Sequence, residues 1–195
     1  MFDRIIQHVQ QEIALTTDEV TYFTTLLTPK KLRRREHLLR AGKPCDFIAY
    51  VSRGLLRSFT TDAAGAEHVL HLAPEDFWLD DLNSLLSRQP SEFTIEALED
   101  SEVVLILAQH LELLYDRLPA FERFFRLLNQ NSYIRTQKRL LCAKDWPAAD
   151  RYQELIRQLP TIEQRVAQHQ IASFLGITPE SLSRLKKGLY EQQHT

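Results

Sequence analysis

The spacing of the apolar residues in this chain changes near Leu107. Between about residue 32 and residue 108, short apolar or alternating runs are separated by turn residues, Gly42, Gly54 and Gly65 among them. Strands spaced roughly 8–12 residues apart are typical of a small barrel or sandwich. After Leu107 the apolar residues recur at helical spacing. The pattern therefore predicts an α+β protein whose sheets precede its main helices.

Strands are expected at five apolar runs. These runs are Phe47 to Val51, Leu55 to Phe59, Val69 to Leu72, Phe93 to Leu98 and Val103 to Leu107. Between the third and the fourth run, the segment from Trp78 to Leu86 has a more helical pattern. Before all of them, Thr16 and Glu19 form a capping-box sequence, which predicts a helix that continues to Pro29.

A long helix is predicted after Pro119, which suits a first-turn position because its missing N–H is not needed there. It follows a shorter helix over Leu111 to Leu118 and ends near Lys144. Its apolar residues are Phe121, Phe124, Phe125, Leu127, Leu128, Tyr133, Ile134, Leu140 and Leu141. This stripe is wider than one face requires, so two interpretations stay open: a core helix packed on the barrel, or a dimer seam.

The formal net charge of -2 conceals an uneven distribution along the chain. Residues 62–122 carry 14 acidic and 2 basic side chains, a net charge of -12. Residues 1–61 have a net charge of +4, and residues 123–195 a net charge of +6. Asymmetry of this kind indicates different partners for different regions. The basic C-terminal third is compatible with an anionic partner, although the whole chain is near neutral.

Simple patterns exclude several classes of protein. No apolar run reaches 18 residues, so no membrane helix is expected, and the amphipathic N-terminal segment is not a secretory signal. Cys45 and Cys142 show no zinc or iron–sulfur spacing and are interpreted as small hydrophobic residues, with an oxidation sensor as the alternative. His68 and His71, three positions apart on a strand, face opposite sides, so no metal site is expected. We expect a cytoplasmic protein without a resident cofactor.

The most informative segment, residues 168–187, predicts two helices joined by a tight turn. Ile171 and Leu175 share one buried face, and Ala172 leaves room for a second helix to cross closely. Gly176 follows as a left-handed C-terminal cap, the conformation in which glycine has no steric cost. This combination of residues predicts a helix-turn-helix.

The second helix of this motif is capped by Thr178 and begins at Pro179. Leu182 and Leu185 face inward, so the polar residues beside them point away from the core. Such a helix presents its N-terminal polar face to the major groove of DNA. Arg184 is expected to read guanine, because its fork matches O6 and N7. The other candidate DNA-binding residues are Gln170, Thr178, Glu180, Ser181, Ser183, Lys186 and Lys187.

The order of barrel, long helix and C-terminal motif resembles the Crp/Fnr superfamily of bacterial transcription regulators. The resemblance is most specific over residues 171–184, Ile-Ala-x-x-Leu-Gly-Ile-Thr-Pro-Glu-x-Leu-Ser-Arg. It extends over roughly residues 15–190 and includes Gly54 with the apolar strand before it.

This resemblance implies an N-terminal antiparallel β-roll, or double-stranded β-helix, with flanking helices. The implied domains are a cyclic-nucleotide-binding-like sensor over 1–118, a dimerisation helix over 119–144 and a helix-turn-helix domain over 145–195. A homodimer would read a palindromic operator on double-stranded DNA, with RNA polymerase as a further candidate partner. In the family, the acidic and basic residues early in the second helix read bases, which corresponds to Glu180 and Arg184.

One departure from the family concerns the ligand cassette. Cyclic-nucleotide sensors hold the phosphate with a segment built around Gly-Glu and an Arg followed by a small polar residue. Here Leu79-Asp80 replaces Gly-Glu, and Ser91-Glu92 stands near the place of the Arg. Because an anionic phosphate needs a cation and free N–H groups, we expect an effector other than cyclic AMP. The candidate effector-binding residues are Trp78, Asp80, Asp81, Arg88, Ser91 and Glu92. Asp80 has two interpretations, a ligand for a ribose-like diol or a solvated turn acid.

The second departure is at the C-terminal end, where no β-hairpin wing of the family type is expected after the second helix. This departure motivates an alternative function, a ligand-binding β-roll with weak or lost DNA binding. A third hypothesis, a cupin-like metal oxygenase, rests on fold analogy alone. We favour a DNA-binding regulator without enzymatic activity.

Overall fold

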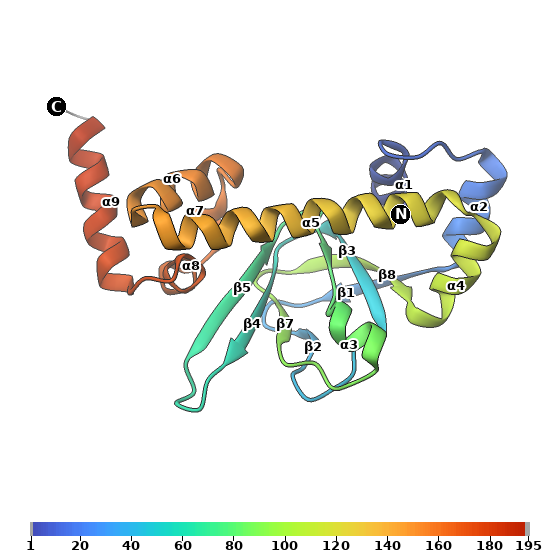
Figure 1. The fold of residues 1–195 in the computed structure, drawn as a ribbon, viewed down its shortest axis with the longest axis horizontal. Coiled ribbons are helices and arrows are strands. Elements are labelled where there is room, and N and C mark those ends of the chain that lie inside the picture. Colours follow the sequence, from blue (N-terminus) through green and yellow to red (C-terminus); the bar gives the residue numbers. More distant parts are fainter. Residues whose placement is uncertain (1, 194–195) are drawn as a thin grey trace.

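The computed structural model describes residues 2–193, without the side chains of Gln192 and Gln193. Two short helices, α1 (Asp3–Gln10) and α2 (Thr17–Thr25), lead into a β-roll (Figure 1). Its strands are β1 (Leu27–Leu32), β2 (His37–Leu39), β3 (Phe47–Arg53), β4 (Leu56–Thr61), β5 (Glu67–Ala73), β6 (Trp78–Leu79), β7 (Thr94–Ala97) and β8 (Ser101–Leu107). They form two antiparallel sheets of order β1-β8-β3-β6 and β2-β7-β4-β5. The protein is therefore α+β, as predicted.

The remaining helices connect the roll to a C-terminal head, defined as residues 148–193. They are α3 (Leu82–Ser87), α4 (Ala108–Arg117), α5 (Ala120–Asp145), α6 (Ala148–Gln158), α7 (Ile162–Arg165), α8 (Gln168–Leu175) and α9 (Pro179–Gln193). In Figure 1, α5 runs across the molecule, with α1, α2 and α4 at one end and the head at the other. No helix within residues 2–193 is long and apolar enough to span a bilayer.

Most expected elements are present, and two boundaries differ. All five predicted runs form strands. The helix expected to continue to Pro29 ends at Thr25, because Leu27 already pairs with Ile106 at the start of β1. Pro29 is accommodated because β1 is an edge strand, where a missing N–H costs no ladder hydrogen bond. The segment expected to be helical from Trp78 begins instead as strand β6.

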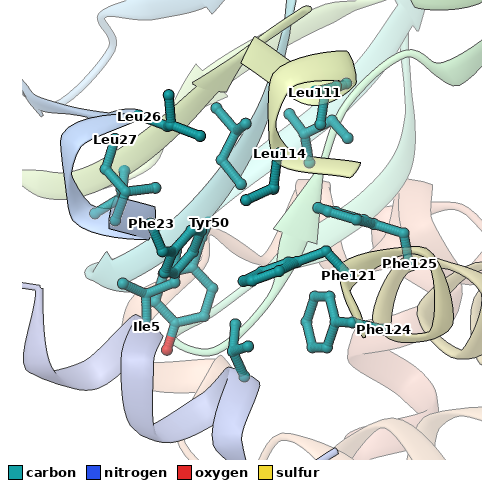
Figure 2. Packing of buried hydrophobic residues seen from close by; sticks show 14 of the residues in the cluster. Ile5, Phe23, Leu26, Leu27, Tyr50, Leu111, Leu114, Phe121, Phe124 and Phe125 are labelled. Carbon is teal, nitrogen blue, oxygen red and sulfur yellow. The ribbon is translucent and has the colours of Figure 1, made fainter. Parts of the chain in front are cut away.

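Two apolar clusters fix the roll. One lies between the two sheets and includes Phe47, Leu56 and Ile95. The other covers the opposite side of the β1-β8-β3-β6 sheet, where α1, α2, α4 and the first half of α5 pack. Figure 2 shows Phe121 and Phe124 of α5 reaching into this second cluster. The helices therefore bury the outward face of this sheet.

The two halves of α5 differ in burial. Phe121, Phe124 and Phe125 in the first half are buried. In the second half, four large apolar side chains are between 47 % and 65 % exposed. They are Tyr133, Ile134, Leu140 and Leu141. The core-helix interpretation thus describes the first half, and the second half retains an uncovered apolar stripe.

The head and the roll share a third apolar cluster. It joins Leu55, Val69 and Leu72 of the roll to buried head residues such as Ile171 and Leu182. The division of the chain at residues 118 and 144 stays a prediction, because this core crosses from one part to the other.

Candidate nucleic-acid interface and effector segment

The turn of the predicted helix-turn-helix is built from local hydrogen bonds. Gly176 ends α8 at φ 68°, ψ 35°, the left-handed conformation expected for a glycine cap. The N–H of Ile177 donates to the carbonyl of Ala172 at 3.0 Å. Thr178 Oγ1 accepts from the N–H of Ser181 at 3.2 Å, which caps α9. The turn thus joins α8 and α9 as one unit.

One face of α9 is exposed, and the other is packed. Leu182 is completely buried in the head. Glu180, Ser183, Arg184 and Lys187 are exposed. The backbone N–H at Glu180, the Thr178 hydroxyl and the Arg184 charge hold the pKa of Glu180 below its usual range. The face therefore carries a carboxylate beside two cations, a mixture that suits base edges and phosphates.

Other predicted contact residues already have protein partners. Lys186 forms an ion pair with Glu163, so a phosphate would have to displace that carboxylate. The Ser181 hydroxyl accepts a hydrogen bond from Thr178 at 3.1 Å. Gln170 and Thr178 lie in a groove beside the roll, apart from the exposed face of α9. Some predicted DNA-binding residues thus lie on the exposed face of α9, whereas others also make contacts within the fold.

The groove beside the roll has a volume of about 620 Å³ and lies between the β4–β5 hairpin and the turn of the head. Its lining residues are Arg57, Glu67, His68, Val69, His169, Gln170, Ser173, Gly176, Ile177, Thr178 and Pro179. Ser173, which sequence reasoning did not single out, bonds to β5 through its hydroxyl. Its position in α8, directly after the small residue Ala172, was the only signal available.

The effector segment contains residues that the roll uses for its own structure. Asp81 caps α3 by accepting from the N–H of Ser84 at 3.0 Å. It also accepts from the Ser91 hydroxyl at 2.7 Å. Arg88, the only cation of the segment, is exposed and ends α3 at φ 59°. Glu92 is exposed as well.

The position of Trp78 contradicts its prediction as an effector-binding residue. It is only 8 % exposed and packs outside the roll, against His8, Tyr50, Phe124 and Phe125. Because its ring is covered by α1 and α5, Trp78 is a core residue rather than part of an effector site.

Asp80 is half-buried, and no hydrogen bond or ion pair within residues 2–193 involves its carboxylate. Burial, with a smaller contribution from Asp81, raises its pKa from 3.8 to about 6. This observation contradicts the interpretation of Asp80 as a solvated turn acid. A phosphate beside Asp80 would raise this pKa further, because a neighbouring anion disfavours the ionised carboxylate. The expectation of an effector other than cyclic AMP stays a prediction.

Two arginines of α5 lie against the roll or the head beside it. The Arg139 guanidinium donates to the carbonyl of Leu70 and lies 5.3 Å from the centre of the Phe174 ring. Arg135 lies 5.4 Å from the centre of the Phe77 ring. Burial, together with these two arginines, lowers the pKa of His71 to about 4, so His71 is neutral at pH 7.

The two strand histidines do not contact each other but each bonds to a different neighbour. His68 is exposed and bonds to Asp62 at 2.9 Å, whereas His71 is half-buried and bonds to Ser58 at 2.9 Å. Among residues 2–193, no group of three His, Cys, Asp or Glu side chains is placed to hold a metal ion. Cys45 is buried, and burial raises its thiol pKa, whereas Cys142 is only half-buried.

The architecture is a β-roll followed by a long helix that carries an exposed apolar stripe and by a head in which a tight turn joins α8 and α9. Residues 29–117 match the family described as "Cyclic nucleotide-binding domain". The transcriptional regulatory protein btr of Bordetella pertussis is 26 % identical over 93 % of this chain and 79 % of its own length.

Solved structures share the fold. The regulator CLP of Xanthomonas campestris, described as responsive to c-di-GMP, has a TM-score of 0.70 at 16 % identity, covering 91 % of this chain and 93 % of that one. A Crp/Fnr-family regulator of Eubacterium rectale, itself described as putative, has a TM-score of 0.68 at 17 % identity, covering 91 % and 85 %. The chain thus shares its fold with structures of regulators, one of them described as of the Crp/Fnr family, and the curated relative that it resembles is itself a transcriptional regulator.

Proposed function

We propose that this protein is a homodimeric transcription regulator that reads a palindromic operator through α9. The observation that supports this proposal best is the exposed polar face of α9, held on a capped turn whose opposite face is packed. In a helix-turn-helix, this arrangement presents side chains to the major groove.

Arg184 is the proposed base-reading residue, and Lys187 a phosphate-binding residue. Both are exposed on α9, so replacing either leaves the core intact. Arg184→Ala is expected to cost about 1–3 kcal/mol at the cognate site and to relax the preference at one base pair. Lys187→Ala is the matched control, because loss of a phosphate contact weakens all sequences about equally.

The experiment is selection of bound fragments from genomic DNA, followed by affinity measurements on the enriched site and on random DNA at several salt concentrations. A steep loss of affinity with rising salt is expected. Equal losses on cognate and random DNA for Arg184→Ala would refute direct reading by Arg184. Failure of the wild type to enrich any palindrome would favour the alternative, a ligand-binding roll with weak or lost DNA binding.

The exposed stripe on the second half of α5 supports the dimer. Apolar patches of this kind on a single helix are typical of helix–helix contacts between subunits. Ile134→Lys combined with Leu141→Lys is expected to give a monomer by analytical ultracentrifugation. Ser132→Lys is the control, since it is exposed but lies about half a turn round the helix. A double variant that remains dimeric would place the interface elsewhere.

For the effector, we propose a compound other than cyclic AMP. The lack of a paired cation beside Asp80 and the use of Asp81 and Ser91 by the fold support this proposal. Calorimetric titration with cyclic AMP is expected to give no heat of binding, and native mass spectrometry of the purified protein tests for a retained ligand. Saturable binding of cyclic AMP would reject the proposal.

A further inference from the structure

The head is joined to the roll by more than the chain that passes through α5. Arg165, at the end of α7, reaches two turns of the roll, one through Glu75 and one through Glu99. Its two terminal nitrogens donate to the Glu75 carboxylate at 3.0 and 2.9 Å. Its Nη2 and Nε donate to the Glu99 carboxylate at 2.6 and 3.3 Å. All three side chains are partly buried, so water screens this network less than an exposed pair.

The carboxylate of Glu75 is held in place by the roll itself. The N–H of Gly54 donates to Glu75 Oε1 at 2.9 Å. Gly54 has φ +93°, and a Cβ at this position would lie 2.3 Å from Ser101 Oγ, so the close approach requires glycine. Burial favours protonation of Glu75, but Arg165 and the Gly54 N–H outweigh it and hold its pKa below the usual range. The pair is therefore ionised and preorganised at neutral pH.

A second attachment lies on the free edge of β5. Ser173, in the middle of α8, donates to the carbonyl of Glu67 at 2.9 Å and accepts from the N–H of Val69 at 3.0 Å. These are backbone groups that an edge strand leaves without a partner strand. Figure 1 shows α8 beside β5, and these two elements are in direct contact.

The two attachments hold different helices of the head. Arg165 ends the helix before α8, and Ser173 lies within α8. The glycine-capped turn joins α8 to α9, so the orientation of α8 sets the orientation of α9. The shared apolar cluster adds buried contact area between the head and the roll.

We propose that Arg165 and Ser173 form a two-point dock that holds the head in one orientation on the roll. In the proposed dimer, this orientation sets the separation of the two copies of α9 and therefore the half-site spacing that the protein accepts. The second statement rests on the proposed DNA-binding function, whereas the dock itself does not. Arg165 and Ser173 are thus positioning residues, not base-reading residues.

Hydrogen exchange of the full-length protein tests the dock without DNA. The Val69 amide is expected to exchange slowly in the wild type, because Ser173 accepts its hydrogen bond. Arg165→Ala and Ser173→Ala should both raise its exchange rate at least about tenfold, while the amides of β3 inside the roll keep their protection. Arg157→Ala is the matched control, since Arg157 pairs with Glu154 within α6 and does not reach the roll.

Variants in the roll serve as controls for the possibility that substitutions in the head unfold it. Glu75→Gln and Glu99→Gln remove the charges that Arg165 binds without changing the head sequence, and they should raise Val69 exchange in the same way. Arg165→Lys keeps the charge but not the fork, so it should restore part of the protection. Unchanged Val69 exchange in Arg165→Ala and in both Gln variants would overturn the dock.

The DNA arm uses operators whose half-sites are separated by zero to four added base pairs. Each added base pair rotates one half-site by about a tenth of a turn, so a docked head should tolerate few spacings. At the preferred spacing, Arg165→Ala is expected to bind about three- to tenfold more weakly than the wild type. When the spacing is changed, the affinity of the variant should fall by a smaller factor than that of the wild type. Lys187→Ala should weaken every spacing alike.

These outcomes separate the two proposals. Faster Val69 exchange with an unchanged spacing profile would overturn the role of the dock in spacing. Higher affinity of Arg165→Ala at the preferred spacing would also overturn it, because the dock would then oppose binding. A wild-type protein that binds no palindrome would refute the proposed function and the spacing role together, while Val69 exchange would still decide the dock.

Discussion

In the roll, three predicted residues of the effector segment serve the fold, whereas in the head two predicted contact residues face outward. Asp81 caps a helix and accepts from Ser91, and Trp78 packs beneath two helices. In the head, Ser183 and Arg184 project from a helix whose other face is buried. A sequence motif therefore predicts a binding face only where the core does not also use its residues.

Replacement of Trp78 should have the largest effect on stability. Trp78→Ala is expected to lower the free energy of unfolding by about 3–5 kcal/mol, because it removes a ring buried against α1 and α5. Urea denaturation measures the loss. Trp146→Ala is the control, since that ring is 45 % exposed and its loss should cost well under half as much. A Trp78→Ala protein of wild-type stability would contradict a core role for Trp78 and would reopen its assignment to the effector site.

Asp80→Asn should stabilise the protein in a pH-dependent way. Because the pKa of Asp80 is raised from 3.8 to about 6 in the folded state, its ionisation opposes folding, and stability is lost as the pH rises through this window. The variant is expected to be more stable than the wild type by about 1–3 kcal/mol at pH 8 and equal to it near pH 4.

The matched control for this substitution is Glu92→Gln, which changes an exposed acid in the same segment. It should shift stability by less than about 0.5 kcal/mol at either pH. A gain for Asp80→Asn that is the same at pH 4 and pH 8 would show that ionisation is not its cause.

Asp81→Ala should destabilise the roll by about 1–2 kcal/mol, because the cap of α3 and the bond from Ser91 are both lost. Asp81→Asn keeps an acceptor oxygen and should recover most of the loss in thermal unfolding. An equal loss in both variants would mean that the charge of Asp81 matters and its cap does not.

Arg184→Ala should have the smallest effect on folding, within about 0.5 kcal/mol of the wild type, despite its effect on DNA affinity. Leu182→Ala, two positions earlier on the buried face of α9, should cost about 2–5 kcal/mol. A comparable loss of stability in both variants would show that the α9 face is part of the core and would remove the contrast between head and roll.

Sequence reasoning succeeded where the structure depends on neighbours along the chain. Gly176 and Thr178 make their hydrogen bonds within a few residues, and the change of spacing near Leu107 separates strands from helices. It failed for Trp78, because β6 has only two residues and an alternating pattern cannot reveal which face is covered. It placed Leu27 in a helix because the apolar spacing suited either element before the pairing with Ile106 was known.

Local sequence patterns predict the order of roll, long helix and head, the capped turn, and which side of α9 is polar. Each of these depends on residue type and on spacing within one or two helical turns. The packing of the elements in three dimensions decides that Asp81 caps α3, that Asp80 is half-buried with a raised pKa, and that Arg165 meets Glu75. Arg165 and Glu75 are 90 positions apart in the chain, so their pairing depends on how whole elements pack, which local patterns do not record.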